Sequence, residues 1–123
     1  MAVFYRKLPR FEYLIPKTLE EALTVLKNQK ESAKVFAGGT DLIPQMKRRE
    51  IPIPKCVLDL KGISKLGAIS FDEDSGLKIG SLVTINALAE SPVIRQHFPS
   101  LFQAASSIGS PQVRNRGTFA GNI

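Results

Sequence analysis

The chain has 123 residues, of which 43% are hydrophobic and 23% charged, and this composition is typical of a folded domain rather than a disordered chain. The formal net charge of +6 is compatible with a nucleic-acid partner, but the Lys and Arg clusters are not interleaved with aromatic residues and Trp is absent. No apolar run approaches the roughly 20 residues that span a bilayer, and the N-terminus has no apolar signal segment. We therefore expect a cytoplasmic protein that has no membrane span and binds no nucleic acid.

The first predicted helix follows a capping box. Thr18 is followed three residues later by Glu21, and apolar residues then recur with the helical period. A Thr hydroxyl and a Glu carboxylate at this spacing bond the first free amides of a helix. The pattern predicts a helix from about Leu19 to Gln29.

A strand, a pair of glycines and a second helix are expected to follow one another directly. The segment at residues 33–37 is short and apolar and ends at Gly38-Gly39, which is typical of a buried strand that runs into a turn. We expect the helix to begin at Thr40 or Asp41. Pro44 then lies in the first turn, where no helical amide bond is lost.

The rest of the chain is predicted to mix short strands with short helices. Cys56 lies in an apolar strand, so we interpret it as a buried thiol that forms no internal disulfide and no metal cluster by itself. Thr84 can cap a helix, and two prolines can begin further helices. The predicted elements are a strand at residues 56–60, a hairpin at 66–71 and 77–79 around an Asp- and Gly-rich turn, a helix at Ile85–Glu90, and helical pieces from Pro92 and Pro99. No linker or repeat interrupts them, so we expect one α+β domain over residues 1–123.

The first candidate site is the glycine pair after the predicted strand. Without side chains at Gly38 and Gly39, the backbone can approach a ligand closely, and free amides at a helix start attract anions. The spacing matches neither a G-x-G-x-x-G fingerprint nor a Walker A loop, and a plain turn is the alternative. Asp41 would repel a phosphate that it faced, so it is expected to bind ribose hydroxyls or to cap the helix.

The second candidate site is the polar segment at residues 110–122. Gly117 and Gly121 free the backbone, while Thr118 and Asn122 supply a hydroxyl and an amide for phosphate or ribose oxygens. A polar surface turn is the alternative interpretation. Two glycine loops in one small domain favour a pyrophosphate ligand, because a pyrophosphate has two phosphates and needs donors from two sides.

Both glycine loops resemble those of one enzyme family, the flavin subunits of molybdenum hydroxylases of the xanthine dehydrogenase and carbon monoxide dehydrogenase type. Residues 35–47 are similar to the family's first flavin loop, Ala-Gly-Gly-(Thr/His/Gln)-(Asp/Ser)-Leu, and residues 113–123 to its second, Arg-Asn-x-(Gly/Ala)-(Thr/Ser)-(Ile/Leu)-Gly-Gly-Asn. Residues 11–18 resemble the family's entry to the first helix, and residues 79–84 its exit from the hairpin. Ala120 stands where the pattern has glycine, and its methyl group excludes backbone angles that only glycine adopts.

The resemblance implies the N-terminal subdomain of the flavin-binding fold that vanillyl-alcohol oxidase-type and enolpyruvoyl-glucosamine reductase-type enzymes share. It implies an FAD-binding oxidoreductase subunit that passes electrons from iron-sulfur clusters through FAD to NAD or another acceptor. The expected partners are a large molybdopterin subunit, which oxidises the substrate, and a small subunit with two iron-sulfur clusters. The expected cofactor-binding residues are Phe36, Ala37, Gly38, Gly39, Thr40, Asp41, Ile108, Gly117, Thr118, Gly121 and Asn122. Phe36 and Ile108 would line the cofactor with apolar side chains, and packing in the core is the alternative for both.

The resemblance also implies residues after Ile123 that would contact the isoalloxazine ring, so we expect this chain alone to be inactive and to bind FAD poorly. No residue is a persuasive catalytic acid or base, and the sole histidine, His97, is expected at the surface or at a helix end. One alternative is another flavoenzyme of the same fold. Another is a truncated, non-catalytic module whose basic face docks a partner subunit.

Overall fold

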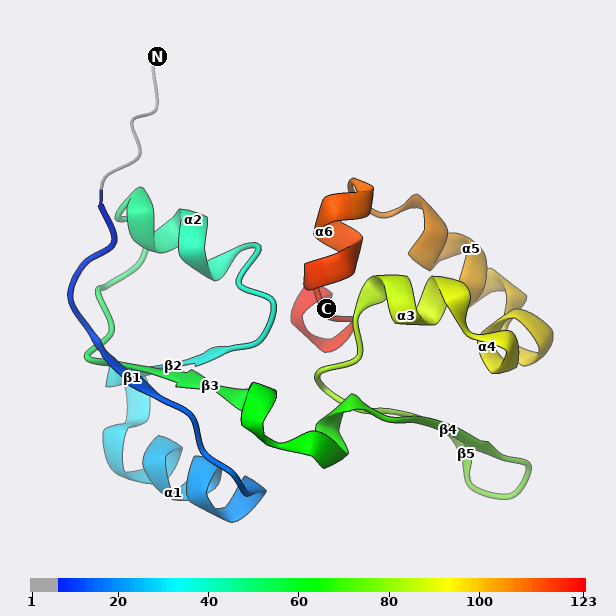
Figure 1. Cartoon of the computed structure of the whole chain (residues 1–123), viewed down its shortest axis with the longest axis horizontal. Helices are drawn as coiled ribbons and strands as arrows, with labels where there is room; N and C mark the ends of the chain where they lie inside the picture. Colours follow the sequence, from blue (N-terminus) through cyan, green and yellow to red (C-terminus); the bar gives the residue numbers. More distant parts are fainter. Residues whose placement is uncertain (1–6) are drawn as a thin grey trace. The chain divides into compact units, whose positions relative to one another are not determined.

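A computed structural model describes residues 7–123, which divide into two compact units (Figure 1). The first unit ends at Ile63 and the second begins at Ser64. No boundary was expected here, because no Gly- and Ser-rich linker marks the junction. Two consecutive short 3-10 helices, Leu60–Gly62 and Ser64–Gly67, lie on either side of it instead.

The first unit is a parallel three-stranded sheet with two helices. Its strands run in the spatial order β1-β3-β2, so the central strand is the last of the three in the chain. Figure 1 shows α1 and α2 on opposite sides of this sheet. The elements are β1 (Glu12–Leu14), α1 (Leu19–Gln29), β2 (Ala33–Phe36), α2 (Leu42–Lys47) and β3 (Cys56–Asp59). The predicted strand-helix-strand organisation is confirmed.

The register of the strands decides which side chains share a face of the sheet. Leu14 pairs with Leu58, and Phe36 pairs with Asp59. Because side chains alternate along a strand, the two leucines lie on one face, and Phe36 and Asp59 on the other. All four residues of β3 are buried, and Cys56 is 1% exposed, which confirms the predicted buried thiol.

Helix α1 has the predicted bounds because its capping box forms. The hydroxyl of Thr18 accepts a hydrogen bond from the Glu21 amide at 3.2 Å. The Glu21 carboxylate in turn accepts one from the Lys17 amide at 2.9 Å. The first bond satisfies an amide that the helix itself leaves without a partner, and the second ties the first turn to the residue before the cap.

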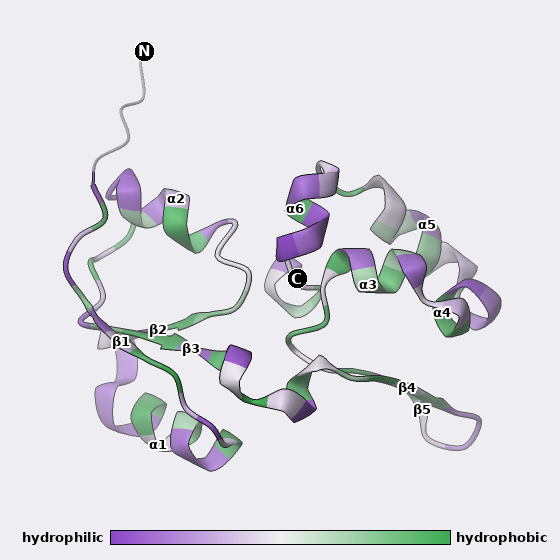
Figure 2. Ribbon diagram, in the orientation of Figure 1, coloured by the Kyte–Doolittle hydropathy of each residue, from purple (hydrophilic) through white to green (hydrophobic). Residues whose placement is uncertain are grey.

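The second unit is a β-hairpin followed by four short helices. The hairpin pairs β4 (Ile69–Asp72) with β5 (Gly76–Ile79). Figure 2 shows hydrophobic residues in both strands and polar ones in the turn. The helices are α3 (Ile85–Glu90), α4 (Pro92–His97), α5 (Pro99–Ser107) and α6 (Pro111–Arg116). Their core is a cluster of Val83, Ile85, Leu88, Ile94 and Ala105.

The caps of the second unit explain which helices the sequence predicted. Thr84 caps α3 through a hydrogen bond from Ala87, and proline begins α4 and α5 as expected. Helix α6 was not predicted as a separate element, although it carries the same signals, a Ser110 cap and Pro111 in its first turn. Strand β1 was also missed, because three residues are too few to show an alternating pattern. Among the described helices, none has the length and apolar character needed to cross a membrane.

Candidate phosphate-binding loops

The first glycine loop connects β2 to α2 at the carboxyl edge of the parallel sheet. Residue 39 has φ +74°, in the left-handed region that favours glycine, and the Gly39 carbonyl accepts a hydrogen bond from Ile43 at 3.1 Å. Within the described part of the chain, the amides of residues 38–41 donate no hydrogen bond. The loop therefore presents consecutive free N–H donors, which is what an anion requires.

Gly39 is needed for a second reason, which is the ring beneath it. A Cβ atom at this position would collide with the Phe36 ring and lie 3.2 Å from Cγ1 of Ile43. Phe36 is half-buried, and its ring packs against the turn at Gly39. The predicted apolar role of Phe36 therefore includes shaping the loop.

The helix that follows the loop contributes less to anion binding than its place in the sequence suggested. Helix α2 has only six residues, so few peptide dipoles add at its first turn. Asp41 stands at the N-cap position, but its side chain makes no capping hydrogen bond, and it is exposed. Of the two roles expected for Asp41, the structure does not support capping, and ribose binding stays a prediction. Thr40 is half-buried in the same turn.

A polar cluster that was not predicted from the sequence lies beside this loop. Asp59, the last residue of β3, is only 3% exposed and accepts hydrogen bonds from the Tyr13 hydroxyl and from the Lys61 amide, the latter at 2.9 Å. The Lys61 ammonium lies 2.9 Å from Asp59 Oδ1 and donates to the Ala37 carbonyl at 2.9 Å. It also lies 3.9 Å from the centroid of the Phe36 ring, a cation–π contact. The signal available in the sequence was an Asp that directly follows the apolar run at residues 56–58.

The partners of Asp59 decide its protonation. Burial by itself would raise the pKa of the carboxyl, but the hydrogen bonds from Tyr13 and from both donors of Lys61 outweigh it. The pKa of Asp59 therefore lies below its ordinary value, and the carboxylate is charged at neutral pH. The hydrogen bond to Asp59 raises the pKa of Tyr13, and burial adds to the effect, so the phenol stays protonated as the donor.

The second glycine loop is anchored to the start of α3. Thr118 pairs with Thr84 in an isolated antiparallel bridge. The Ile85 amide donates to the Gly117 carbonyl at 2.9 Å, and the Phe119 amide donates to the Val83 carbonyl at 3.0 Å. Gly117 and Thr118 are both buried as a result.

The side chain of Thr118 holds this loop through a hydrogen bond. Its hydroxyl accepts a hydrogen bond from the Gly121 amide at 3.0 Å, and a Cβ atom at position 121 would lie 2.7 Å from that oxygen. Gly121 and Asn122 are exposed, so they are the accessible part of the loop. Ala120 does not have a positive φ, so its methyl group costs no backbone strain at this departure from the family pattern.

Ile108 is held by the turn between α5 and α6. It is half-buried and packs against the core cluster of the second unit. The Arg114 guanidinium donates to the carbonyls of Ile108 and Gly109 at 3.1 and 3.2 Å. Its predicted contact with a cofactor stays a prediction beside this packing role. His97 is exposed at the end of α4 and stacks on Phe71, as its predicted helix-end position implies.

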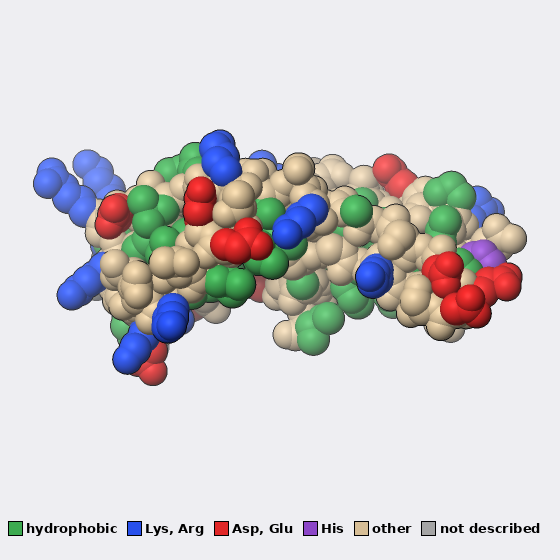
Figure 3. Space-filling model, turned by 90° about the horizontal axis from the view of Figure 1, so that it is seen from below, with side chains coloured by type: hydrophobic (Ala, Val, Ile, Leu, Met, Phe, Trp, Pro, Cys, Tyr) green, Lys and Arg blue, Asp and Glu red, His purple; other side chains and the backbone are tan. Residues whose placement is uncertain are grey.

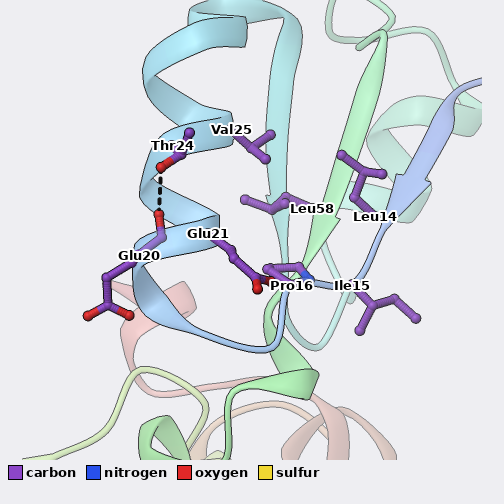
Figure 4. A pocket seen from close by; sticks show the side chains of 8 residues that line it. All are labelled: Leu14, Ile15, Pro16, Glu20, Glu21, Thr24, Val25 and Leu58. Carbon is purple, nitrogen blue, oxygen red and sulfur yellow. Dashed lines mark hydrogen bonds between the residues drawn. The ribbon is translucent and has the colours of Figure 1, made fainter.

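A groove of about 550 Å³ lies elsewhere in the first unit. Figure 4 shows its lining side chains, which come from α1, from Leu14 of β1 and the two residues after it, and from Leu58 of β3. Leu14 and Leu58 belong to the face of the sheet that α1 covers, whereas Phe36 and Asp59 belong to the other face. The groove is therefore separate from the glycine loop.

Comparison with known families identifies the type of domain. The sequence model of the family described as the FAD binding domain in molybdopterin dehydrogenase matches residues 9–123, which include both glycine loops. The chain belongs to this family. FAD is the cofactor of the family, as the resemblance of the two loops implied.

Relatives of the family are similar over nearly all of the chain. The medium chain of carbon monoxide dehydrogenase from Hydrogenophaga pseudoflava is 42% identical over 115 residues, covering 94% of this chain and 39% of the relative. The FAD-subunit of nicotinate dehydrogenase from Eubacterium barkeri is 41% identical over 114 residues, covering 92% of this chain and 38% of the relative. The chain therefore spans about 39% of the length of such relatives.

Solved structures agree with the sequence comparison. A structure of the Hydrogenophaga pseudoflava enzyme matches with a TM-score of 0.87 at 42% identity, over 94% of this chain and 39% of that chain. Quinoline 2-oxidoreductase from Pseudomonas putida 86 matches with a TM-score of 0.86 at 34% identity, over the same shares. The expected mixed helix and sheet fold of the flavin-binding type is confirmed. The match favours molybdenum hydroxylases over other flavoenzymes of the same fold.

Proposed function

We propose that residues 37–41 and 117–122 bind the pyrophosphate of FAD, and that the chain is the FAD-holding part of a medium subunit of a molybdenum hydroxylase. The observation that carries this proposal is the run of free amides at residues 38–41, at the carboxyl edge of the sheet. The accessible Gly121 and Asn122 of the second loop support it, as does the family match over both loops.

Bound FAD supplies the redox chemistry, and the described residues of this chain bind and orient it. We propose that the subunit passes electrons from iron-sulfur clusters on a small subunit through FAD to NAD or another acceptor. The substrate would be oxidised on a separate large molybdopterin subunit. The names of the relatives support this place in an assembly, because they are a medium chain and an FAD-subunit of dehydrogenases.

The isolated 123-residue chain is expected to bind FAD weakly. Hydrogen bonds from amides to phosphate compete with water, so each contributes only on the order of 1 kcal/mol, or somewhat more when charge-assisted. Tight binding needs the flavin ring buried against apolar side chains. Of the two apolar residues predicted to line the cofactor, Phe36 supports the first loop and Ile108 packs in the core of the second unit.

Titration of the ¹⁵N-labelled chain with ADP tests the proposal, because ADP carries the pyrophosphate and adenosine of FAD without the ring. We expect amide shifts at residues 38–41 and at Gly121 and Asn122, and none with adenosine, which lacks phosphate. Shifts confined to other residues, or none at millimolar ADP, would reject the site. A visible spectrum after incubation with FAD and desalting checks the affinity, and a stoichiometrically yellow chain would contradict the weak binding.

A further inference from the structure

Lys61 lies outside both glycine loops, yet its side chain reaches the first one. It belongs to the short 3-10 helix Leu60–Gly62 that follows β3. Its ammonium donates to the Ala37 carbonyl at 2.9 Å, at the start of the Gly38–Gly39 turn. The aliphatic part of the side chain brings the charge over the Phe36 ring, which itself supports Gly39.

The position of this ammonium is fixed by a buried carboxylate, that of Asp59. Asp59 pairs with it at 2.9 Å and is itself held by the Tyr13 hydroxyl and the Lys61 amide. Tyr13 lies on β1 and Asp59 on β3, so two adjacent parallel strands contribute to the anchor. The side chain of Asp59 is 4% exposed, whereas that of Lys61 is 45% exposed. The Lys61 ammonium is therefore held by a buried partner and remains accessible to solvent.

The bond to the Ala37 carbonyl has a direct consequence for the next amide. The described chain contains no cis peptide bond, so the Ala37 carbonyl and the Gly38 N–H point in opposite directions across one planar group. A cation on the carbonyl therefore directs the Gly38 N–H away from Lys61. It also polarises the peptide, which makes that N–H a stronger donor to an anion.

We propose that Lys61 is a positioning residue of the phosphate site, which orients and polarises the Ala37–Gly38 peptide so that the Gly38 N–H points at a bound phosphate. This inference rests on the proposed function, and it adds to that function a residue outside the glycine motif. Asp59 and Tyr13 act through Lys61 by holding its ammonium against the carbonyl.

The test is an ADP titration of the full 123-residue chain carrying Lys61→Met, followed by amide shifts. We expect the dissociation constant for ADP to rise about tenfold, since hydrogen bonds that involve charged groups are worth more than neutral ones. The ADP-induced shift of Gly38 should shrink most. Lys61→Arg keeps the charge and should keep most of the affinity. Lys55→Met is the matched control, because Lys55 directly precedes β3, at the opposite edge of the sheet, and loses the same charge.

The outcomes separate the inference from the function on which it rests. Wild-type affinity and an unchanged Gly38 shift in Lys61→Met would overturn the role of Lys61. Equal losses in Lys61→Met and Lys55→Met would overturn it as well, because they would indicate a long-range effect of net charge. No ADP-induced shift in the wild-type chain would instead reject the proposed function. If Lys61→Met fails to fold, Asp59→Asn with Lys61→Met removes the charge together with its buried partner and should show the same tenfold loss of ADP affinity; wild-type affinity would reject the inference.

Discussion

Gly39 carries two separate constraints, and a second glycine in the chain allows them to be distinguished. Both Gly39 and Gly76 have a positive φ, so alanine at either position costs about 1–2 kcal/mol of backbone strain. Only at position 39 would the new methyl group also meet the Phe36 ring, since a Cβ at position 76 has no atom within 4 Å. A substitution at Gly39 is therefore expected to lower stability through the clash with Phe36, and not only to block the side of the loop that a ligand approaches.

We predict that Gly39→Ala lowers the melting temperature more than Gly76→Ala and removes the ADP-induced shifts of residues 38–41. Gly76→Ala should keep those shifts, because the hairpin turn is not part of the site. Circular dichroism and the ADP titration measure the two effects. Equal melting temperatures for the two variants would show that Phe36 moves aside without cost. The larger Gly39→Val should follow the same direction and reduce flavin binding in a longer form of the protein.

The ionisation of Asp59, which holds Lys61 at the site, makes the stability of the fold depend on pH in the acid range. Its pKa is lower in the folded chain than in the unfolded one, so its ionisation stabilises the fold above the ordinary Asp pKa of about 3.9. This contribution is lost as the pH falls through the lower, folded value. Asp59→Asn should therefore destabilise the chain at pH 7 by about 1–3 kcal/mol and lose less stability on acidification than the wild type. Urea unfolding at pH 7 and pH 3 measures both, and parallel losses would contradict the linkage.

At the scale of elements, helix α3 connects the core of the second unit to its glycine loop. Thr84 caps the helix by accepting a hydrogen bond from the Ala87 amide at 3.1 Å, and the same residue forms the bridge to Thr118. The order of the second loop therefore depends on where α3 begins. A change in the cap is expected to reach the loop through the two backbone hydrogen bonds beside it.

We predict that Thr84→Ala destabilises the second unit by about 1 kcal/mol, the usual value of an N-cap side chain, and that Thr84→Ser restores most of it. The amide of Phe119, which is bonded to Val83, should exchange with solvent faster in Thr84→Ala. Hydrogen exchange followed by NMR measures both amide protection and the local free energy of opening. Unchanged protection at Phe119 would show that the loop is held independently of the cap.

At the scale of the whole molecule, the basic charge is spread over many local contacts. Arg49 donates to the carbonyls of Met46 and Lys7, Arg48 pairs with Glu50, and Arg114 donates to Ile108 and Gly109. On the face that Figure 3 displays, most Lys and Arg side chains are scattered among acidic, apolar and other side chains, and a few lie next to one another. Such a distribution offers phosphate contacts but no base-reading or stacking surface.

We predict that the chain binds duplex DNA only weakly and with a steep dependence on salt. Fluorescence anisotropy with two duplexes of different sequence, at low and moderate salt, measures affinity and specificity together. Submicromolar affinity that depends on the sequence of the duplex would overturn both this prediction and the expectation that the chain binds no nucleic acid. Weak, salt-dependent binding would instead show that the +6 net charge is a property of the surface rather than of a nucleic-acid site.

The sequence by itself determined the features that neighbouring residues control. Helix starts at Thr18 and Thr84 and the turn at Gly38–Gly39 depend on side chains within a few positions of each other, so local patterns predicted them. The glycine pattern also carried the family resemblance that the comparisons confirmed.

Only the tertiary structure decided which distant groups meet. Tyr13 reaches Asp59 across 46 positions because parallel pairing places β1 beside β3, and Lys61 reaches Ala37 across 24 positions for the equivalent reason on the other side of β3. The burial of Thr118 likewise follows from its bridge to Thr84. Parallel strands are joined by crossovers, and strand pairing between distant segments has no local signature in the sequence, so the roles of Lys61 and Thr118 became visible only in the folded chain.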